Sequence, residues 1–117
     1  MKRPLKSGEK DFIFSMLDKI NRKDYLSKIF DLVYVNEAND GGMGGLTFFI
    51  ENNIDFDRSF GEVLVSVEFY DVYKIKVIAT LNLDNKNQLY ELDIFKVDFS
   101  PLSHPLDNSY RIERILD

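Results

Sequence analysis

The first group of residues that could do chemistry is a glycine cluster, Asp40-Gly41-Gly42-Met43-Gly44-Gly45. It holds four of the chain's six glycines. Glycine is needed where the backbone takes a positive φ or where another molecule approaches the main chain. A phosphate-binding loop would lead into a helix, but here a strand-forming run at residues 46–50 follows. We therefore expect a turn between strands, with Asp40 capping its backbone and Met43 plugging the core. The candidate binding residues of this cluster are Asp40, Gly41, Gly42, Met43 and Gly44.

A pair of carboxylates forms the second candidate group. Glu91 and Asp93 are two residues apart on a predicted strand, so both side chains are expected on its outer face. Neighbouring carboxylates can divide acid and base roles between them or share a divalent cation. Lys74 and Lys76 are predicted on the same face, and a solvated, ion-paired surface is therefore the alternative. We keep the two acids as candidate binding residues without assigning a metal.

The only histidine, His104, lies in a predicted loop. Its side chain is the one whose ordinary pKa lies near neutrality, but a general base also needs an orienting acid and a nucleophile, and the sequence places neither beside it. The motifs of serine hydrolases, zinc proteases and kinases are absent. We therefore assign no catalytic residue, no metal ligand and no cofactor, favour a role other than catalysis, and keep His104 as a candidate binding residue.

Composition narrows the classes of partner. The 117 residues carry a net charge of −5, and a surface of that sign repels the phosphate backbone of nucleic acids. The absence of cysteine excludes disulfides and cysteine-ligated metal sites. No apolar run reaches the length of about 20 residues that a membrane span requires. We expect a cytoplasmic protein that binds neither nucleic acid nor membranes.

Two apolar periodicities predict a pair of helices near the N-terminus. After Ser7, a residue type that caps helices, apolar side chains recur at positions 13, 16, 17 and 20, which is the spacing of an amphipathic helix. The same spacing at positions 26, 29, 30 and 33 predicts a second, shorter helix. Near the other end, Pro101 and Pro105 end the last strand, and a short C-terminal helix is predicted to follow.

After the glycine cluster the apolar period changes to two, which predicts strands that are buried on one face. Folding the chain into a hairpin places Val67 beside Val77 and Glu68 opposite Lys76, so that register and charge agree. The predicted fold class is α+β, with the N-terminal helical pair packed on a mostly antiparallel sheet of four or five strands. We expect one domain that spans residues 1–117.

Three segments of the chain resemble the motifs of an uncharacterised bacterial family of small single-domain proteins, which is classed as a domain of unknown function. They are Arg3-Pro4-Leu5 with Glu9, Asp40-Gly41-Gly42-Met43-Gly44, and the sequence ELDIFKVDFSPL that starts at Glu91. Gly45 and Phe95 depart from the family pattern, in which serine and tryptophan are expected. The resemblance implies a single domain in a bacterial cytoplasm, and it implies no activity.

The function that these features favour is that of a non-catalytic protein-binding module. A net charge of −5 and an outer face that mixes Tyr70 and Phe95 with Glu91 and Asp93 suit a basic protein partner. In these respects the chain resembles the small acidic immunity proteins that neutralise basic nucleases. One alternative is a small-ligand or metal-dependent hydrolytic site made of the glycine cluster, the two carboxylates and His104. The other is an accessory domain that forms a homodimer through the aromatic face.

Overall fold

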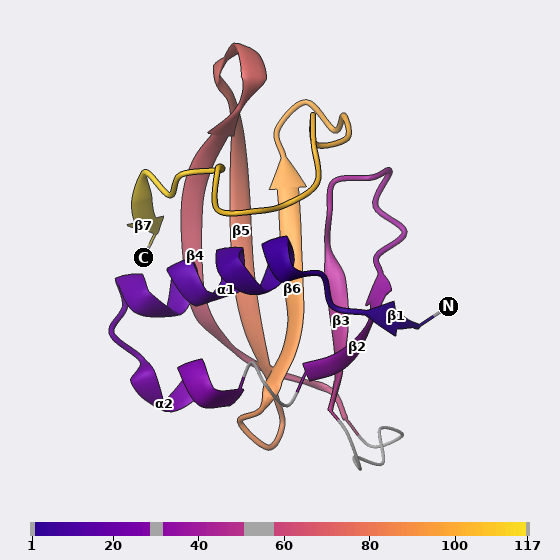
Figure 1. The fold of residues 1–117 in the computed structure, drawn as a ribbon, viewed down its shortest axis with the longest axis vertical. Coiled ribbons are helices and arrows are strands. Elements are labelled where there is room, and N and C mark those ends of the chain that lie inside the picture. The colour runs from indigo at the N-terminus through magenta and orange to yellow at the C-terminus, as the bar shows by residue number, and fades with distance from the viewer. Residues whose placement is uncertain (1, 29–31, 51–57, 117) are drawn as a thin grey trace.

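The computed structural model describes residues 2–28, 32–50 and 58–116, and the main element of this part of the chain is a seven-stranded sheet (Figure 1). The strands lie in the order β1-β2-β3-β6-β5-β4-β7, and each neighbouring pair is antiparallel. Their bounds are β1 (Arg3–Pro4), β2 (Leu32–Glu37), β3 (Leu46–Ile50), β4 (Phe60–Asp71), β5 (Ile75–Asp84), β6 (Leu89–Lys96) and β7 (Arg114–Leu116). The hairpin of β4 and β5 extends beyond the rest of the sheet (Figure 1).

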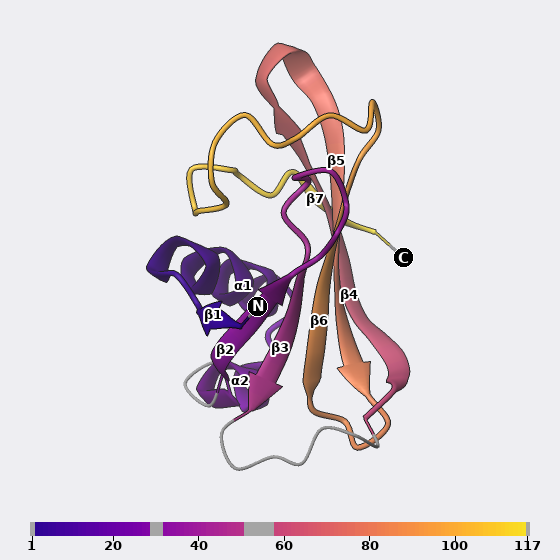
Figure 2. The ribbon, with the colours of Figure 1, turned by 90° about the vertical axis from the view of Figure 1, so that its right-hand side faces the viewer.

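Helix α1 (Ser7–Lys19) lies across one face of the sheet, whereas the other face carries no helix of the described chain (Figure 2). The first turn is fixed by Glu9, whose carboxylate accepts a hydrogen bond of 2.9 Å from the backbone N–H of Lys6. The helical spacing places four apolar side chains on the side that faces the sheet. They are Phe12, Ile13, Met16 and Leu17, and all are fully buried. Within the described residues, no helix has the length and apolar character that crossing a membrane requires.

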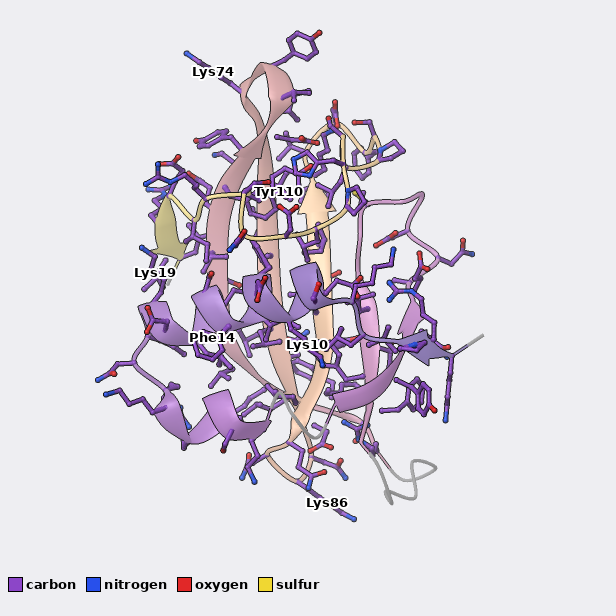
Figure 3. All side chains as sticks on the ribbon, viewed as in Figure 1. Lys10, Phe14, Lys19, Lys74, Lys86 and Tyr110 are labelled. Carbon is purple, nitrogen blue, oxygen red and sulfur yellow. The ribbon has the colours of Figure 1, made fainter. Side chains whose placement is uncertain are left out.

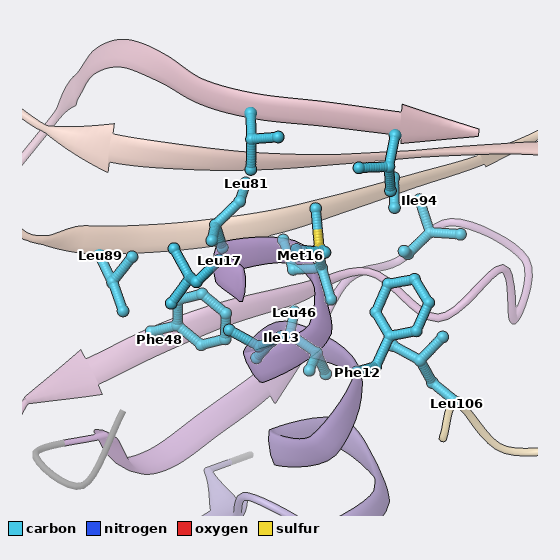
Figure 4. Close-up of a cluster of buried hydrophobic side chains, with 14 of the residues drawn as sticks. Phe12, Ile13, Met16, Leu17, Leu46, Phe48, Leu81, Leu89, Ile94 and Leu106 are labelled. Atoms are coloured by element: carbon cyan, nitrogen blue, oxygen red, sulfur yellow. The ribbon is translucent and has the colours of Figure 1, made fainter. Parts of the chain in front are cut away.

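The core lies between α1 and the inner side of the sheet (Figure 4). Inward-facing residues of β3, β5 and β6 meet the helix there, and they include Leu46, Phe48, Leu81, Leu89 and Ile94. Burying one such large apolar side chain contributes about 1.5–3 kcal/mol. This burial holds α1 on one face and leaves the opposite face of the sheet open.

The predicted fold class is wrong in its balance of helix and strand. The structure is 21% helical and 43% strand, and α2 (Lys23–Leu26) is a single turn rather than a second packed helix. Positions 29–31 lie outside the described residues, and the predicted helix is replaced by β2 from Leu32 onward. The run at positions 32–35 is rich in β-branched and aromatic residues, and pairing with β1 on one side and β3 on the other decides its conformation.

The predicted C-terminal helix is also wrong, because that segment adds a strand. β7 pairs antiparallel with the middle of β4, where Ser66, Val67 and Glu68 are its partners. The sheet has seven strands rather than four or five because short strands at both ends of the chain extend it. Strands of two or three residues carry too little periodicity to be recognised in a sequence.

The hairpin of β4 and β5 differs from the predicted register by two residues. Val67 pairs with Ala79 and Glu68 pairs with Ile78, because the chain reverses in a single 3-10 turn at Val72–Lys74. Side chains alternate between faces along a strand, so a shift of two residues leaves each of them on its predicted face. The predicted register is therefore wrong, but the assignment of inner and outer residues in this hairpin is unchanged. The predicted charge pair still forms on a diagonal, with the ammonium of Lys76 3.5 Å from the carboxylate of Glu68.

Candidate functional site

A pocket of about 420 Å³ lies on the side of the sheet that α1 covers. Three segments form its walls, namely the residues from β1 to the first turn of α1, the glycine loop between β2 and β3, and the loop at residues 102–106. Pockets that bind small molecules have volumes of about 300–1,000 Å³. The titratable residues that line the pocket are Arg3, Lys6, Glu9, Glu37, Asp40 and His104. Two of the predicted groups, the glycine loop and His104, are therefore brought together.

Asp40 holds the glycine loop in place. One oxygen of its carboxylate accepts a hydrogen bond of 3.1 Å from the N–H of Met43, and the other accepts one of 2.9 Å from the N–H of Gly45. This arrangement confirms the predicted capping of the turn by Asp40. Met43 packs against the core, and its sulfur accepts a 3.3 Å hydrogen bond from the N–H of Lys96. The side chain of Met43 thus plugs the inner side of the loop.

The glycines allow the loop to pack against the segment that follows β6. Gly42 and Gly44 have φ angles of 83° and 105°. A Cβ atom on Gly42 would lie 3.2 Å from the Cβ of Pro101, and one on Gly44 would lie 3.0 Å from the Cδ1 of Leu102. The N–H of Leu102 donates a 3.2 Å hydrogen bond to the carbonyl of Gly42. The two motifs at the glycine cluster and at residues 101–102 therefore contact each other and build adjoining walls of the pocket.

The charges on the wall formed by β1 and α1 are largely paired. The guanidinium of Arg3 donates two hydrogen bonds to the carboxylate of Glu9, at 3.0 and 2.7 Å, and a third of 2.9 Å to Glu37. Hydrogen bonding to Glu9 raises the pKa of Arg3 above its ordinary value. By contrast, the ammonium group of Lys6 makes no ion pair within the described residues. Lys6 is therefore the available cation of the pocket.

A buried ion pair fixes the third wall. The ammonium of Lys96 lies 2.8 Å from the carboxylate of Asp71, and both side chains are almost completely buried. The N–H groups of Val72 and Ser103 also donate to Asp71, while Lys96 donates to the carbonyl of Pro101. Burial alone would raise the pKa of Asp71, but these hydrogen bonds outweigh it and hold the pKa well below its ordinary value. The pair ties the loop after β6 to the sheet.

His104 is positioned by Tyr110, which lies over the sheet between α1 and the end of the long hairpin (Figure 3). The hydroxyl of Tyr110 donates to Asp71 at 3.1 Å and accepts a 3.2 Å hydrogen bond from the N–H of His104. The two rings are stacked, with centroids 4.0 Å apart. Burial raises the pKa of Tyr110 to about 12. The imidazole thus has a fixed place at the mouth of the pocket, with its Nδ1 3.0 Å from the carbonyl of Pro105.

Glu91 and Asp93 do not line the pocket. They alternate along β6 with Leu92 and Ile94, which are buried in the core, so the two acids lie on the face of the sheet opposite α1, which we call the outer face (Figure 2). The structure therefore separates them from the glycine loop and His104, and the hydrolytic site that would combine all these groups is not assembled. Glu91 accepts a 3.0 Å hydrogen bond from Asn82.

Apolar side chains gather on the outer face at the end nearest the tip of the long hairpin. Phe95 pairs across the sheet with Ile78, and its ring meets that of Phe99 edge to face, with centroids 5.3 Å apart. Tyr70 lies on β4, two residues after Glu68, which pairs with Ile78. We call Tyr70, Ile78, Phe95 and Phe99 the aromatic patch. Tyr70, Phe95 and Phe99 have exposed fractions of 41%, 38% and 69%.

The family of the chain is shown by a match that spans most of it. The family described as Domain of unknown function (DUF6984) matches residues 2–105. The chain belongs to this family. The expectation of a domain of unknown function is thereby confirmed. No curated protein and no solved structure matches the chain. The part that matches DUF6984 contains the pocket walls except for Leu106, together with the strands of the aromatic patch, and it ends before Tyr110 and β7.

Within the described residues, no group of three His, Cys, Asp or Glu side chains could hold a metal ion. The sequence interpretation missed the buried pair of Asp71 and Lys96 and a second buried pair, Arg58 and Asp84, which lie 2.8 Å apart. A signal was present, because Lys96 follows Leu92 and Ile94 at the spacing of inward-facing residues.

Proposed function

We propose that this domain is a protein-binding module that docks a basic protein on its outer face. The observation that carries the proposal is the aromatic patch, because it lies on the one sheet face that no described element covers (Figure 2). Aromatic residues dominate the binding energy of protein interfaces. The hydrophobic core of the described residues, by contrast, lies on the side of the sheet that α1 covers.

The backbone conformation of two aromatic residues also favours a contact surface at this end of the sheet. Phe99 has a φ of 63°, and Tyr73, at the tip of the adjacent hairpin, has a φ of 60° and an exposed fraction of 92%. A bulky residue in this left-handed region costs about 1 kcal/mol or more. The edge-to-face contact with Phe95 offsets part of this cost for Phe99, whereas the largely exposed ring of Tyr73 gains little from packing in the free domain. The presence of both residues is explained if they contact a partner.

Charge favours a basic partner. The chain carries a net charge of −5, and Asp93 on the outer face forms no ion pair within the described residues. Carboxylates beside aromatic anchors suit the side chains of lysine and arginine. The small acidic immunity proteins that neutralise basic nucleases are binders of this type.

The test is quantitative capture of partners from a lysate of the source cells on the immobilised domain. The Phe95→Ser variant should lose at least about 90% of a stoichiometric basic protein, since interface anchors are worth about 2 kcal/mol or more. Phe14→Ser is the matched control, because Phe14 is also exposed but lies on α1, on the other side of the sheet (Figure 3). Both variants should unfold at a similar denaturant concentration.

The role of charge is tested separately. The double variant Glu91→Gln/Asp93→Asn should slow association and reduce its dependence on salt. Asp11→Asn/Asp18→Asn changes the net charge equally on the exposed side of α1 and should have a smaller effect. If the captured protein is acidic, if it is a second copy of this chain, or if Phe14→Ser abolishes capture as fully as Phe95→Ser, the proposal is contradicted.

A further inference from the structure

We propose that the pocket beside the glycine loop binds a small zwitterion, a molecule that carries one ammonium group and one carboxylate. This site is independent of the proposed protein-binding surface, because it lies on the opposite side of the sheet. The inference rests on the volume of the pocket, about 420 Å³, and on which of its charged groups are already paired.

The available positive group is Lys6. Arg3 also lines the pocket, but its guanidinium is engaged by the carboxylates of Glu9 and Glu37. The backbone N–H of Lys6 donates to Glu9 and its carbonyl accepts from the N–H of Lys10. The ammonium of Lys6 forms no hydrogen bond or ion pair with a described residue, although its charge helps to lower the pKa of Glu37. An anionic group of a ligand would find its partner here.

The available negative group is Glu37. Both oxygens of Asp40 accept backbone hydrogen bonds inside the glycine loop, and both oxygens of Glu9 accept hydrogen bonds from Arg3 or from the N–H of Lys6. Only one oxygen of Glu37 is bonded to Arg3, and its side chain is 70% exposed. Among the lining residues, the cations Arg3 and Lys6 face the three carboxylates of Glu9, Glu37 and Asp40, so one negative charge remains in excess even though Lys6 also acts on Glu37.

A ligand with a single charge would satisfy only one of these two groups. A simple anion would meet Lys6 but would also meet the excess negative charge of Glu37 and Asp40. A simple cation would meet Glu37 but would also meet Lys6. A molecule with both charges pairs with both groups, and the fixed imidazole of His104 at the mouth of the pocket adds one more hydrogen-bonding partner.

The experiment is a titration of the isotopically labelled full chain, followed by the amide signals of Gly42 and Gly44 in NMR spectra. The zwitterionic probes are glycine, β-alanine and 4-aminobutyrate, which place the two charges at increasing separation. Acetate and methylammonium are the probes with a single charge. At least one zwitterion should give saturable shifts in the millimolar range, with a Kd about tenfold or more below that of either single-charge probe.

Two variants locate the contacts. Lys6→Gln and Glu37→Gln should each raise the Kd of the bound zwitterion by about fivefold or more, whereas Lys10→Gln, a charge change on α1 outside the pocket lining, should leave it unchanged. Thermal melting shows that all three variants fold. Absence of saturable shifts with every zwitterion, equal affinity for acetate or for methylammonium, or equal affinity of Lys6→Gln and wild type would each overturn the proposal. None of these results bears on binding at the outer face.

Discussion

At the scale of single residues, several carboxylates of this chain act on its own backbone. Asp40 accepts hydrogen bonds from two N–H groups of the glycine loop. Asp71 does the same for Val72 and Ser103, and Asp84 for Lys86 and Gln88. These acids hold turns in fixed conformations, so they are not the acids that a partner or ligand meets. The sequence predicted that role for Asp40, because Asp40 precedes a glycine run. It could not predict the role of Asp71, because the partners of Asp71 are distant in sequence.

The buried pair of Lys96 and Asp71 should matter for stability. Lys96→Met leaves a buried carboxylate without its cation and should lower the free energy of unfolding by about 3 kcal/mol. The comparison is Lys76→Met, because Lys76 is partly exposed and its buried partner Glu68 keeps a second ion pair with Arg114. Loss of such a partly exposed cation should cost about 1 kcal/mol or less. Urea denaturation measures the free energy of unfolding of both variants. Equal losses in the two variants would show that the buried pair has no special role.

Tyr110 should make stability depend on alkaline pH. Burial raises its pKa to about 12 in the folded state, against about 10 in an unfolded chain. The stabilisation from the neutral phenol is therefore complete below pH 10 and is lost as the pH rises through about 12. In Tyr110→Phe the fall in the free energy of unfolding with rising pH should be smaller by up to about 2 kcal/mol. The pKa of Tyr25 is also raised by burial, so part of the decline should persist in this variant.

The control for Tyr110 is Tyr73→Phe, because the ring of Tyr73 is exposed. The free energy of unfolding is measured by urea titration between pH 9 and about pH 12, the upper end of the Tyr110 transition. If Tyr110→Phe and Tyr73→Phe show the same dependence on pH, the hydroxyl of Tyr110 is not buried as the structure places it.

At the scale of elements, two loops far apart in sequence support each other. The glycine loop between β2 and β3 packs against Pro101 and Leu102, and the pair of Asp71 and Lys96 holds that second loop on the sheet. The glycine run and the prolines each predicted a turn, but their contact depends on β6 lying next to β3. Sequence spacing carries no information on that neighbourhood.

Gly44→Ala should therefore lower the free energy of unfolding more than Gly41→Ala does. Gly41 has a φ of 72° and open space around it, so Gly41→Ala should cost about 1 kcal/mol. Gly44 has a φ of 105° and would place its Cβ 3.0 Å from Leu102, so Gly44→Ala should cost about 2–3 kcal/mol. The midpoints of denaturant unfolding give the comparison. Equal costs would argue against close packing of the two loops.

At the scale of the whole molecule, the two faces of the sheet differ. The inner face, α1 and the residues after β6 form the core and the pocket, while the outer face carries the aromatic patch together with Glu68, Glu91 and Asp93. Alternation along the strands was enough to predict which residues of the central strands face outward. It could not predict a seven-stranded sheet, because β1, β2 and β7 depend on pairing between distant segments.

The most direct test of the central claim is photo-cross-linking from the outer face. A photoreactive phenylalanine replaces Phe99 in one sample and Phe14 in another, and each is irradiated in the lysate of the source cells. The aromatic patch predicts a cross-link to a basic protein from position 99 and none from position 14. A partner cross-linked from position 14 alone, or no cross-link from position 99, would contradict the assignment of the outer face as the binding surface.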